Sequence, residues 1–153
     1  MPLATLRPAT PEDDARVRAL LASNGLPASD LAGAGAEFVV ACLGGKVIGT
    51  GALQHFGAAA LLRSVAVEPT QRGLGIGSLI VRELESRARA SGVLELVLLT
   101  QTAESFFARQ GYGQSDRRKA PAAVKASEEF RALCPASATC MTKSLAPHSR
   151  SST

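Results

Sequence analysis

Residues 64–78 read SVAVEPTQRGLGIGS, which is an apolar strand pattern followed by a glycine-rich turn and the start of a helix. Glycines allow a ligand to approach the backbone closely, and the free N–H groups at the start of a helix attract anions. Arg72 adds a cation at the mouth of this turn. The stretch therefore predicts a phosphate-binding strand–turn–helix unit, with a plain tight turn as the alternative interpretation.

Two known nucleotide-binding motifs do not fit this stretch. A P-loop requires Gly-Lys-Ser or Gly-Lys-Thr, and neither occurs here. The dinucleotide-binding fingerprint requires the spacing G-x-G-x-x-G and an acidic residue after the second strand. Here the spacing is G-x-G-x-G, and the next strand pattern, LELVLLT at 94–100, ends in Thr100. The sequence thus excludes both motifs.

Strand and helix patterns extend this unit in both directions along the chain. Gly44-Gly45 between two apolar runs is a direct β-hairpin signal. The predicted strands span residues 3–7, 37–43, 46–54, 60–67, 94–100, 114–117 and 139–145, and the predicted helices span about 10–24, 76–91, 103–110 and 121–133, with one short helix between 26 and 35. These elements predict a single α+β domain over 1–146 with a mixed sheet, followed by a disordered tail over 147–153.

Composition excludes several classes of protein. The chain has 153 residues, of which 46% are hydrophobic and 20% are charged, as is typical of one folded domain. Its formal net charge is +4, but only 4% of its residues are aromatic, too few for a base-stacking surface, so we expect no nucleic-acid partner. No apolar run approaches the roughly 20 residues that cross a membrane, and acidic residues precede any hydrophobic run at the N-terminus. We therefore expect a soluble cytoplasmic protein with no membrane partner.

The three cysteines, Cys42, Cys134 and Cys140, form no CxxC pair. An odd number without such a pair argues against a disulfide framework and fits a reducing compartment. No histidine pattern accompanies them, so we expect no metal site.

Two blocks of sequence stand in the order and spacing of one family's motifs. The first is VEP at 67–69 with RGLGIG at 72–77, and the second is FFARQGY at 106–112. With these blocks the chain resembles the GNAT (Gcn5-related) N-acetyltransferase family over residues 3–145. The resemblance implies a mostly antiparallel central sheet, flanked by helices, whose fourth and fifth strands splay apart. The C-terminal segment also resembles a GNAT subgroup associated with arsenic resistance operons.

The resemblance implies that acetyl-CoA is the co-substrate. Main-chain N–H groups at the start of the helix, with Arg72, would hold its pyrophosphate. Main-chain groups of Val65 and Val67 would hold the pantetheine arm, and one N–H there would polarise the thioester. The cofactor-binding residues implied in this way are Val65, Val67, Arg72, Gly73, Leu74, Gly75, Gly77, Ser78 and Phe107.

The proton donor and the base remain open at the level of sequence. The family commonly uses a tyrosine to protonate the departing thiolate, but Phe107 stands at that position and has no proton to give. Tyr112, Ser105 or a water molecule are the candidate replacements. For the acceptor amine, His55 and Glu37 are the candidate bases, since either group can take a proton near neutral pH when its environment favours it.

Arg63 and Ser64 are the candidate residues of the acceptor site. They lie in the apolar run LLRSV at 61–65, and a buried arginine is costly unless it meets an anion. We therefore expect an acceptor with an anionic group, to which Arg117 and Arg118 could contribute. An arginine on an exposed edge, or one paired with Glu37, is the alternative interpretation of Arg63.

Three hypotheses of function follow from these residues and the resemblance. The leading one is an acetyl-CoA-dependent N-acetyltransferase that acts on a small amine, such as an amino-acid-like toxic or arsenical compound. The alternative is a catalytically weak acyl-CoA-binding or sensing protein, motivated by Phe107. A third is direct binding of an arsenical by Cys134 and Cys140. Pairing through C-terminal strands, which is common in the family, leaves a homodimer open.

Overall fold

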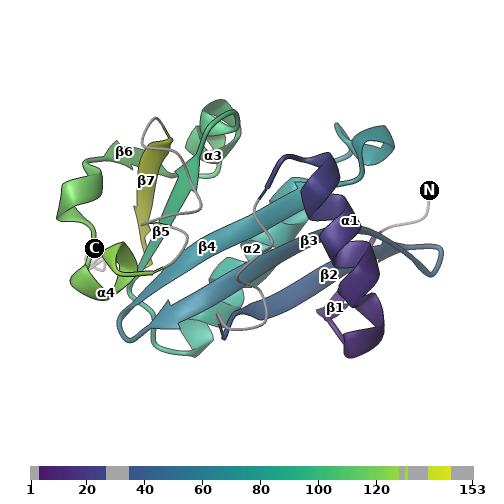
Figure 1. Ribbon diagram of the computed structural model, residues 1–153, viewed down its shortest axis with the longest axis horizontal. Coiled ribbons are helices and arrows are strands. Elements are labelled where there is room, and N and C mark those ends of the chain that lie inside the picture. The colour runs from purple at the N-terminus through teal and green to yellow at the C-terminus, as the bar shows by residue number, and fades with distance from the viewer. Residues whose placement is uncertain (1–3, 27–34, 128–129, 131–137, 146–153) are drawn as a thin grey trace, which may run out of the picture.

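The computed structural model describes residues 4–26, 35–127, 130 and 138–145 of the chain. Its centre is a seven-stranded sheet in the order β1-β2-β3-β4-β5-β7-β6 (Figure 1). The strands are β1 (Thr5–Pro8), β2 (Glu37–Leu43), β3 (Lys46–Phe56), β4 (Ala59–Val67), β5 (Glu95–Thr100), β6 (Gly113–Ser115) and β7 (Thr139–Ser144). Strands β4 and β5 are parallel, and the other neighbouring pairs are antiparallel. The structure confirms the predicted α+β class with a mixed, mostly antiparallel sheet.

The helices stand close to their predicted places, with one exception. They are α1 (Asp14–Ser23), α2 (Ile76–Ala90), α3 (Glu104–Arg109) and α4 (Ala122–Lys125), with 3-10 turns at η1 (Pro11–Asp13), η3 (Pro69–Gln71) and η4 (Arg117–Lys119). Helix α4 is shorter than the predicted helix over 121–133. It ends at Lys125 with a turn at Ala126 and a bend at Ser127, and the N–H of Phe130 donates to the Ser127 hydroxyl (3.4 Å). Residues 27–34, 128–129, 131–133 and 147–153, on which other predictions fall, lie outside the described residues.

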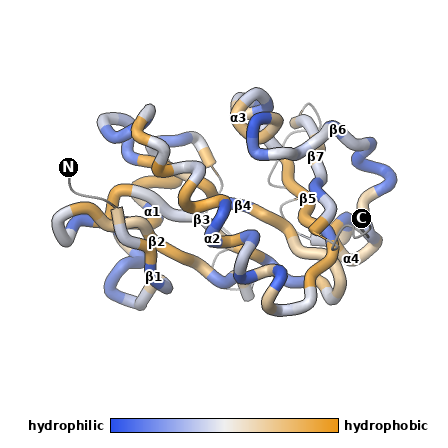
Figure 2. Tube along the Cα trace, turned by 180° about the vertical axis from the view of Figure 1, so that it is seen from behind, coloured by the Kyte–Doolittle hydropathy of each residue, from blue (hydrophilic) through white to orange (hydrophobic). Residues whose placement is uncertain are grey.

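Helices α1 and α2 lie on opposite faces of the sheet (Figure 1). Glycines in β3 allow α2 to approach closely, because a Cβ on Gly51 would lie 2.6 Å from Ile80 Cγ2 and 2.9 Å from Leu84 Cδ1. The main buried cluster forms at this contact and extends to β5 and α3. Figure 2 shows the central strands as the hydrophobic part of the chain trace. Burial of one such leucine or isoleucine side chain contributes about 1.5–3 kcal/mol, so this contact fixes α2 on the sheet.

The start of the first helical segment is fastened to β1 by the carboxylate of Asp13. It accepts hydrogen bonds from the N–H of Thr10 (2.7 Å) and from both terminal nitrogens of Arg7 (2.8 and 3.1 Å). The Arg7 guanidinium and the Thr10 N–H hold the pKa of this carboxyl well below its ordinary value of 3.8. Thr10 is thus the N-cap of the 3-10 turn η1, with Pro11 at its first position, and the α-helix predicted from about residue 10 begins at Asp14.

Strands β4 and β5 pair only at one end and then diverge. The paired residues are Ala59–Leu61 and Glu95–Val97, after which the two strands separate (Figure 1). A bulge interrupts β4 at Ser64, whose φ of +61° lies in the left-handed region. The Glu68 N–H donates to Ile48 O of β3 (2.7 Å), and N–H groups alternate along a strand. The N–H groups of Val65 and Val67 therefore face away from β3, toward the open edge.

Candidate active site

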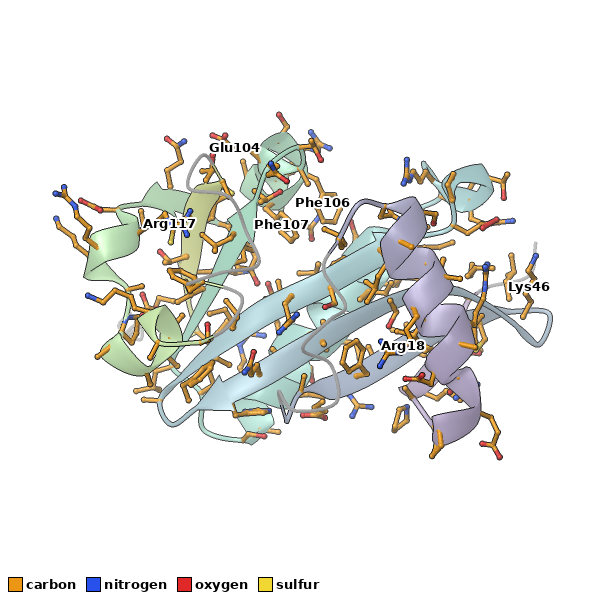
Figure 3. The ribbon with its side chains drawn as sticks, viewed as in Figure 1. Arg18, Lys46, Glu104, Phe106, Phe107 and Arg117 are labelled. Atoms are coloured by element: carbon orange, nitrogen blue, oxygen red, sulfur yellow. The ribbon has the colours of Figure 1, made fainter. Side chains whose placement is uncertain are left out.

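The glycine-rich turn forms one wall of a cavity of about 620 Å³. The opposite wall comes from Val65 and Val67 of β4 and from Phe106 and Phe107 of α3. Figure 3 shows both rings on the side of α3 that faces the space between β4 and β5. A Cβ on Gly77 would lie 3.1 Å from the Phe106 ring, so a side chain there would crowd this wall. The space between turn and ring exists because position 77 is glycine.

The backbone of the turn is shaped to present N–H groups to an anion. Gly73 and Gly75 have φ values of +84° and +80°, which glycine adopts without strain. Gly75 precedes the first residue of α2, whose first helical hydrogen bond runs from the Leu79 N–H to Gly75 O (3.1 Å). The N–H groups before Leu79 are therefore the unpaired donors of a helix N-terminus. Leu74, whose main-chain N–H was predicted to hold the pyrophosphate, is 59% exposed and does not line this cavity.

Arg72 places a positive charge at the mouth of this cavity. Its side chain is exposed, and its Nη2 donates to Asn24 Oδ1 at the end of α1 (2.5 Å). Within the described residues, no carboxylate pairs with Arg72. The guanidinium is therefore hydrogen-bonded to a neutral amide, which a phosphate group of the cofactor can replace.

A second cavity of about 350 Å³ adjoins the first. Arg63 and Ser64 line it from β4, and Leu98 and Thr100 line it from β5. The residues that line both cavities are Asn24, Val65, Thr102, Ala103 and Phe107. The two cavities thus meet where β4 and β5 have separated.

Arg63 is buried in the second cavity with an exposed fraction of 3%. Its Nε donates to Ser64 Oγ (3.3 Å) and its Nη1 donates to Gln54 Oε1 (3.2 Å). Leu62 packs in the cluster beneath α2, so the next side chain in the strand lies on the opposite face. The structure therefore brings the predicted pair, Arg63 and Ser64, to one cavity beside Val65.

Comparison with known proteins identifies the fold. The model of the acetyltransferase (GNAT) domain matches residues 34–114, which is more than half of the chain. The chain belongs to the GNAT acetyltransferase family. This membership confirms the predicted family. No match was found among curated proteins.

Solved structures show the same GNAT fold. N-acetylglutamate synthase from Neisseria gonorrhoeae, complexed with coenzyme A and N-acetyl-glutamate, matches 96% of this chain with a TM-score of 0.81 and 19% identity. This chain spans only 36% of that synthase, about a third of its length. Rv2747 from Mycobacterium tuberculosis, in complex with CoA, matches 93% of this chain and 99% of its own at 27% identity and a TM-score of 0.76. The ribosomal-protein-S18-alanine N-acetyltransferase from Escherichia coli matches 95% of this chain and 96% of its own at 16% identity and a TM-score of 0.72.

His55 and Glu37, the candidate bases, lie on the other face of the GNAT sheet. His55 Nε2 is 3.2 Å from Glu37 Oε1, and the second oxygen of Glu37 accepts from Nη1 of Arg87 on α2 (3.0 Å). Burial alone would raise the pKa of Glu37, but the hydrogen bonds from Arg87 and His55 outweigh it and lower the pKa. The structure does not bring either candidate base to the cavity of Arg63.

The hydroxyl of Tyr112, a candidate acid, is hydrogen-bonded to a buried carboxylate outside both cavities. Its hydroxyl donates to the buried Glu85 (2.9 Å), which also accepts from Lys143 Nζ (3.1 Å). Burial, followed by the negative charge of Glu85, raises the pKa of Tyr112 well above its ordinary value. Its ring packs edge-on against Phe107 with centroids 5.7 Å apart, and it lines neither cavity. Of the candidate acids, Ser105 does line the first cavity.

The sequence also led to expectations about metal sites, membrane spans and cysteines. Over the described ranges, no group of three His, Cys, Asp or Glu side chains is placed to hold a metal ion. No helix in the same ranges has both the length and the apolar character needed to cross a bilayer. Burial raises the pKa of the Cys140 thiol, and Cys42 packs beneath α1. Cys134 lies outside the described residues.

Sequence reasoning missed Asn24 as a member of the site. In the sequence, Asn24-Gly25 indicates only the end of a helix. In the GNAT fold the asparagine lines both cavities and contacts Arg72, which is 48 positions away in the chain. No local sequence signal connects two such distant residues, so only the fold could reveal this contact.

Proposed function

We propose that the protein transfers the acetyl group of acetyl-CoA to the amine of a small molecule that carries an anionic group. The observation that supports this is the junction of the two cavities at Val65 and Phe107. One cavity has the donors for a pyrophosphate, and the other holds the buried Arg63. Both substrates can then be bound at once, with the thioester and the amine meeting at the junction.

The cofactor side fits acetyl-CoA through its backbone. The N–H groups at the start of α2 and the guanidinium of Arg72 would hold the pyrophosphate. The main-chain groups of Val65 and Val67, which face the open edge of β4, would hold the pantetheine arm. The structures from N. gonorrhoeae and M. tuberculosis are described with CoA, which supports this cofactor for the shared fold.

The reaction is a direct attack of the amine on the thioester. The ammonium form of the acceptor loses one proton, and its nitrogen then bonds to the acetyl carbonyl carbon. The C–S bond breaks and the electron pair leaves on sulfur; the nitrogen loses a second proton. One of the two protons ends on the sulfur of CoA and the other in solvent. The Val65 N–H would donate to the carbonyl oxygen as charge develops there, and positioning supplies much of the rate.

Proton transfer falls to water and small hydroxyl groups. The described lining of the second cavity contains no carboxylate and no imidazole, so water would carry the first proton away. Phe107 stands at the junction and has no proton to give, so the sulfur would be protonated by water or by Ser105. A CoA thiolate is a tolerable leaving group near neutral pH, so turnover continues with weak acid catalysis.

Arg63 indicates the chemical class of the acceptor. A carboxylate can meet its planar guanidinium with two parallel hydrogen bonds in a buried site. An acceptor with both an amine and a carboxylate is an amino acid or a compound that resembles one. The N. gonorrhoeae synthase is described with N-acetyl-glutamate, which agrees with an amino-acid-like acceptor on this fold. An amino-acid-like arsenical belongs to the same class.

The test is the release of CoA thiol with a panel of amines. Each amino acid is paired with the amine that lacks only its carboxylate, and an arsenical amino acid is included. We expect kcat/KM to be about 10- to 150-fold higher for the carboxylated member, as one charge-assisted contact contributes about 1.5–3 kcal/mol. Arg63→Met should remove this preference, and Arg63→Lys should keep part of it. Arg87→Met, on the other face of the sheet, is the matched control and should keep all of it.

Two results of this panel would contradict the proposal. Equal kcat/KM values for both members of every pair would contradict the proposal that the acceptor carries an anionic group. Tight CoA binding by calorimetry with no thiol release would favour the second candidate, a catalytically weak acyl-CoA-binding protein, which Phe107 motivates. The highest kcat/KM for the arsenical would support a role in detoxification.

Pairing of two copies stays a prediction that analytical ultracentrifugation would test.

A further inference from the structure

Asn24 sits at the point where the two cavities join. It follows the last residue of α1 and lines both cavities. Its Nδ2 donates to Leu20 O of its own helix (2.8 Å) and, at longer range, to Val67 O (3.4 Å). Its Oδ1 accepts from Arg72 (2.5 Å). One amide thus connects the pyrophosphate turn with the open edge of β4.

A bound pyrophosphate would compete with Asn24 for the guanidinium of Arg72. A guanidinium makes stronger hydrogen bonds to a phosphate than to a neutral amide, because both partners are then charged. Arg72 is exposed and within the described residues has no acidic partner that would oppose such a change. Binding of CoA would therefore draw Arg72 away and leave the amide oxygen of Asn24 without its donor.

A free amide oxygen in the second cavity has an evident use. An acceptor ammonium needs hydrogen-bond acceptors, and the described lining of this cavity offers neither a carboxylate nor an imidazole. Arg63 would hold the anionic end of the acceptor, and Asn24 lies where the cavity opens toward the thioester. The amide oxygen would thus accept from the amine that is to react.

We propose that the amide oxygen of Asn24 binds the acceptor amine. Arg72 occupies this oxygen until the pyrophosphate of acetyl-CoA binds Arg72 and breaks the contact. The cofactor then completes the acceptor site, so the two ligands bind with positive coupling. This inference rests on the proposed function, because it requires an amine acceptor. Coupling is reciprocal, so the acceptor also raises the affinity for CoA.

Calorimetry with CoA and the best carboxylated amine of the panel tests the coupling. In the wild type, CoA should tighten binding of the amine by about tenfold, within the usual range for coupled sites. In Arg72→Met, the amine should bind without CoA about as tightly as it binds the wild type with CoA. In Asn24→Leu, CoA should no longer tighten amine binding, and KM for the amine should rise about tenfold.

A matched control separates this role from a role at the helix end. Ser23 Oγ donates to Leu20 O (3.0 Å), the same carbonyl that Asn24 Nδ2 contacts, but Ser23 lines neither cavity. Ser23→Ala should therefore keep the coupling. Its melting temperature shows how much stability is lost with one hydrogen bond to Leu20 O. In Asn24→Leu, CoA alone should bind about tenfold more tightly than it binds the wild type, because the amide no longer holds Arg72.

The outcomes distinguish this inference from the proposed function. Wild-type coupling that persists in Asn24→Leu, or an Arg72→Met variant that binds the amine only as weakly as the wild type without CoA, would overturn the inference alone. A wild type that binds no amine even with CoA would contradict the proposed function, and the inference with it.

Discussion

The two cavities of this GNAT domain are built in different ways. One side of the cofactor cavity comes from a single continuous stretch, residues 65–78, whose glycines leave room for the ligand, and the other side comes mainly from residues 102–110. The acceptor cavity is formed by side chains that distant elements bring together, from α1, β4, β5 and α3. The first can be recognised in a sequence and is insensitive to most side-chain changes. In the proposed function the second would determine which amine reacts, through single side chains such as Arg63.

The largest expected effect comes from filling the backbone cavity. Gly77→Val would place its Cβ about 3.1 Å from the Phe106 ring and its methyl groups in the path of the cofactor. Overpacking costs about 1–3 kcal/mol, so the Kd for CoA measured by calorimetry should rise roughly 5- to 150-fold. The preference for carboxylated amines should stay unchanged.

Gly113→Ala is the control for this change, because a Cβ there meets nothing within 4 Å. It should leave CoA binding intact. A Gly77→Val variant that binds CoA normally but loses its acceptor preference would break the distinction between the two cavities.

A smaller effect is expected at Phe107, one of the residues that line both cavities. Phe107→Tyr restores a hydroxyl at the position where the family commonly has an acid. We expect kcat to rise about three- to tenfold, below the roughly 100-fold that a general acid often contributes, since the CoA thiolate leaves readily. The KM values for both substrates should change little in steady-state assays.

Phe106→Tyr is the matched control, because Phe106 lines the cofactor cavity but not the acceptor cavity. It should leave kcat unchanged. Equal gains in both variants would mean that the hydroxyl does not act at the junction.

The smallest effect should appear away from both cavities. Asp13→Asn removes the charge that Arg7 and the Thr10 N–H stabilise, and we expect the melting temperature at pH 7 to fall by about 2–4 °C. The folded pKa of Asp13 lies below its ordinary value of 3.8. Its stabilisation is therefore complete above about pH 4 to 5 and is lost as the pH falls toward the folded pKa.

The difference between wild type and Asp13→Asn should accordingly shrink below about pH 4 in thermal melts. Asp14→Asn, whose side chain is 61% exposed and pairs with Arg18, is the control and should change the melting temperature less. Acceptor preference and CoA affinity should be unchanged in both variants. A difference that grows toward low pH would contradict the role of the Asp13 carboxylate.

Much of the fold could be predicted because its signals are local. Gly44-Gly45 predicts the β2–β3 hairpin, and the periodic apolar residues of 76–91 predict α2, which spans Ile76–Ala90. Helix α4 ends at Lys125, short of the predicted end at Leu133, while residues 128–129 and 131–133 lie outside the described residues. The cofactor wall was predictable for the same reason as the hairpin, since its residues are neighbours in the sequence.

The acceptor side could be predicted only in part, because its geometry depends on contacts between distant residues. A bulge at Ser64 shifts the alternation of side chains in β4, so the sequence alone does not give the face on which each residue lies. The hydrogen bond from Tyr112 to Glu85 connects residues that are 27 positions apart in the sequence. His55 is a plausible base by its chemistry, but its strand places it with Glu37 on the α2 face.

A crystal structure with CoA and the preferred amine tests the central claim most directly. We expect the pyrophosphate on the N–H groups between Gly73 and Ser78, the sulfur beside Val65 and Phe107, and the acceptor carboxylate on Arg63. The amine nitrogen should lie within bonding reach of the position of the acetyl carbon. A sulfur atom away from the junction, or an acceptor that binds without contacting Arg63, would contradict the account.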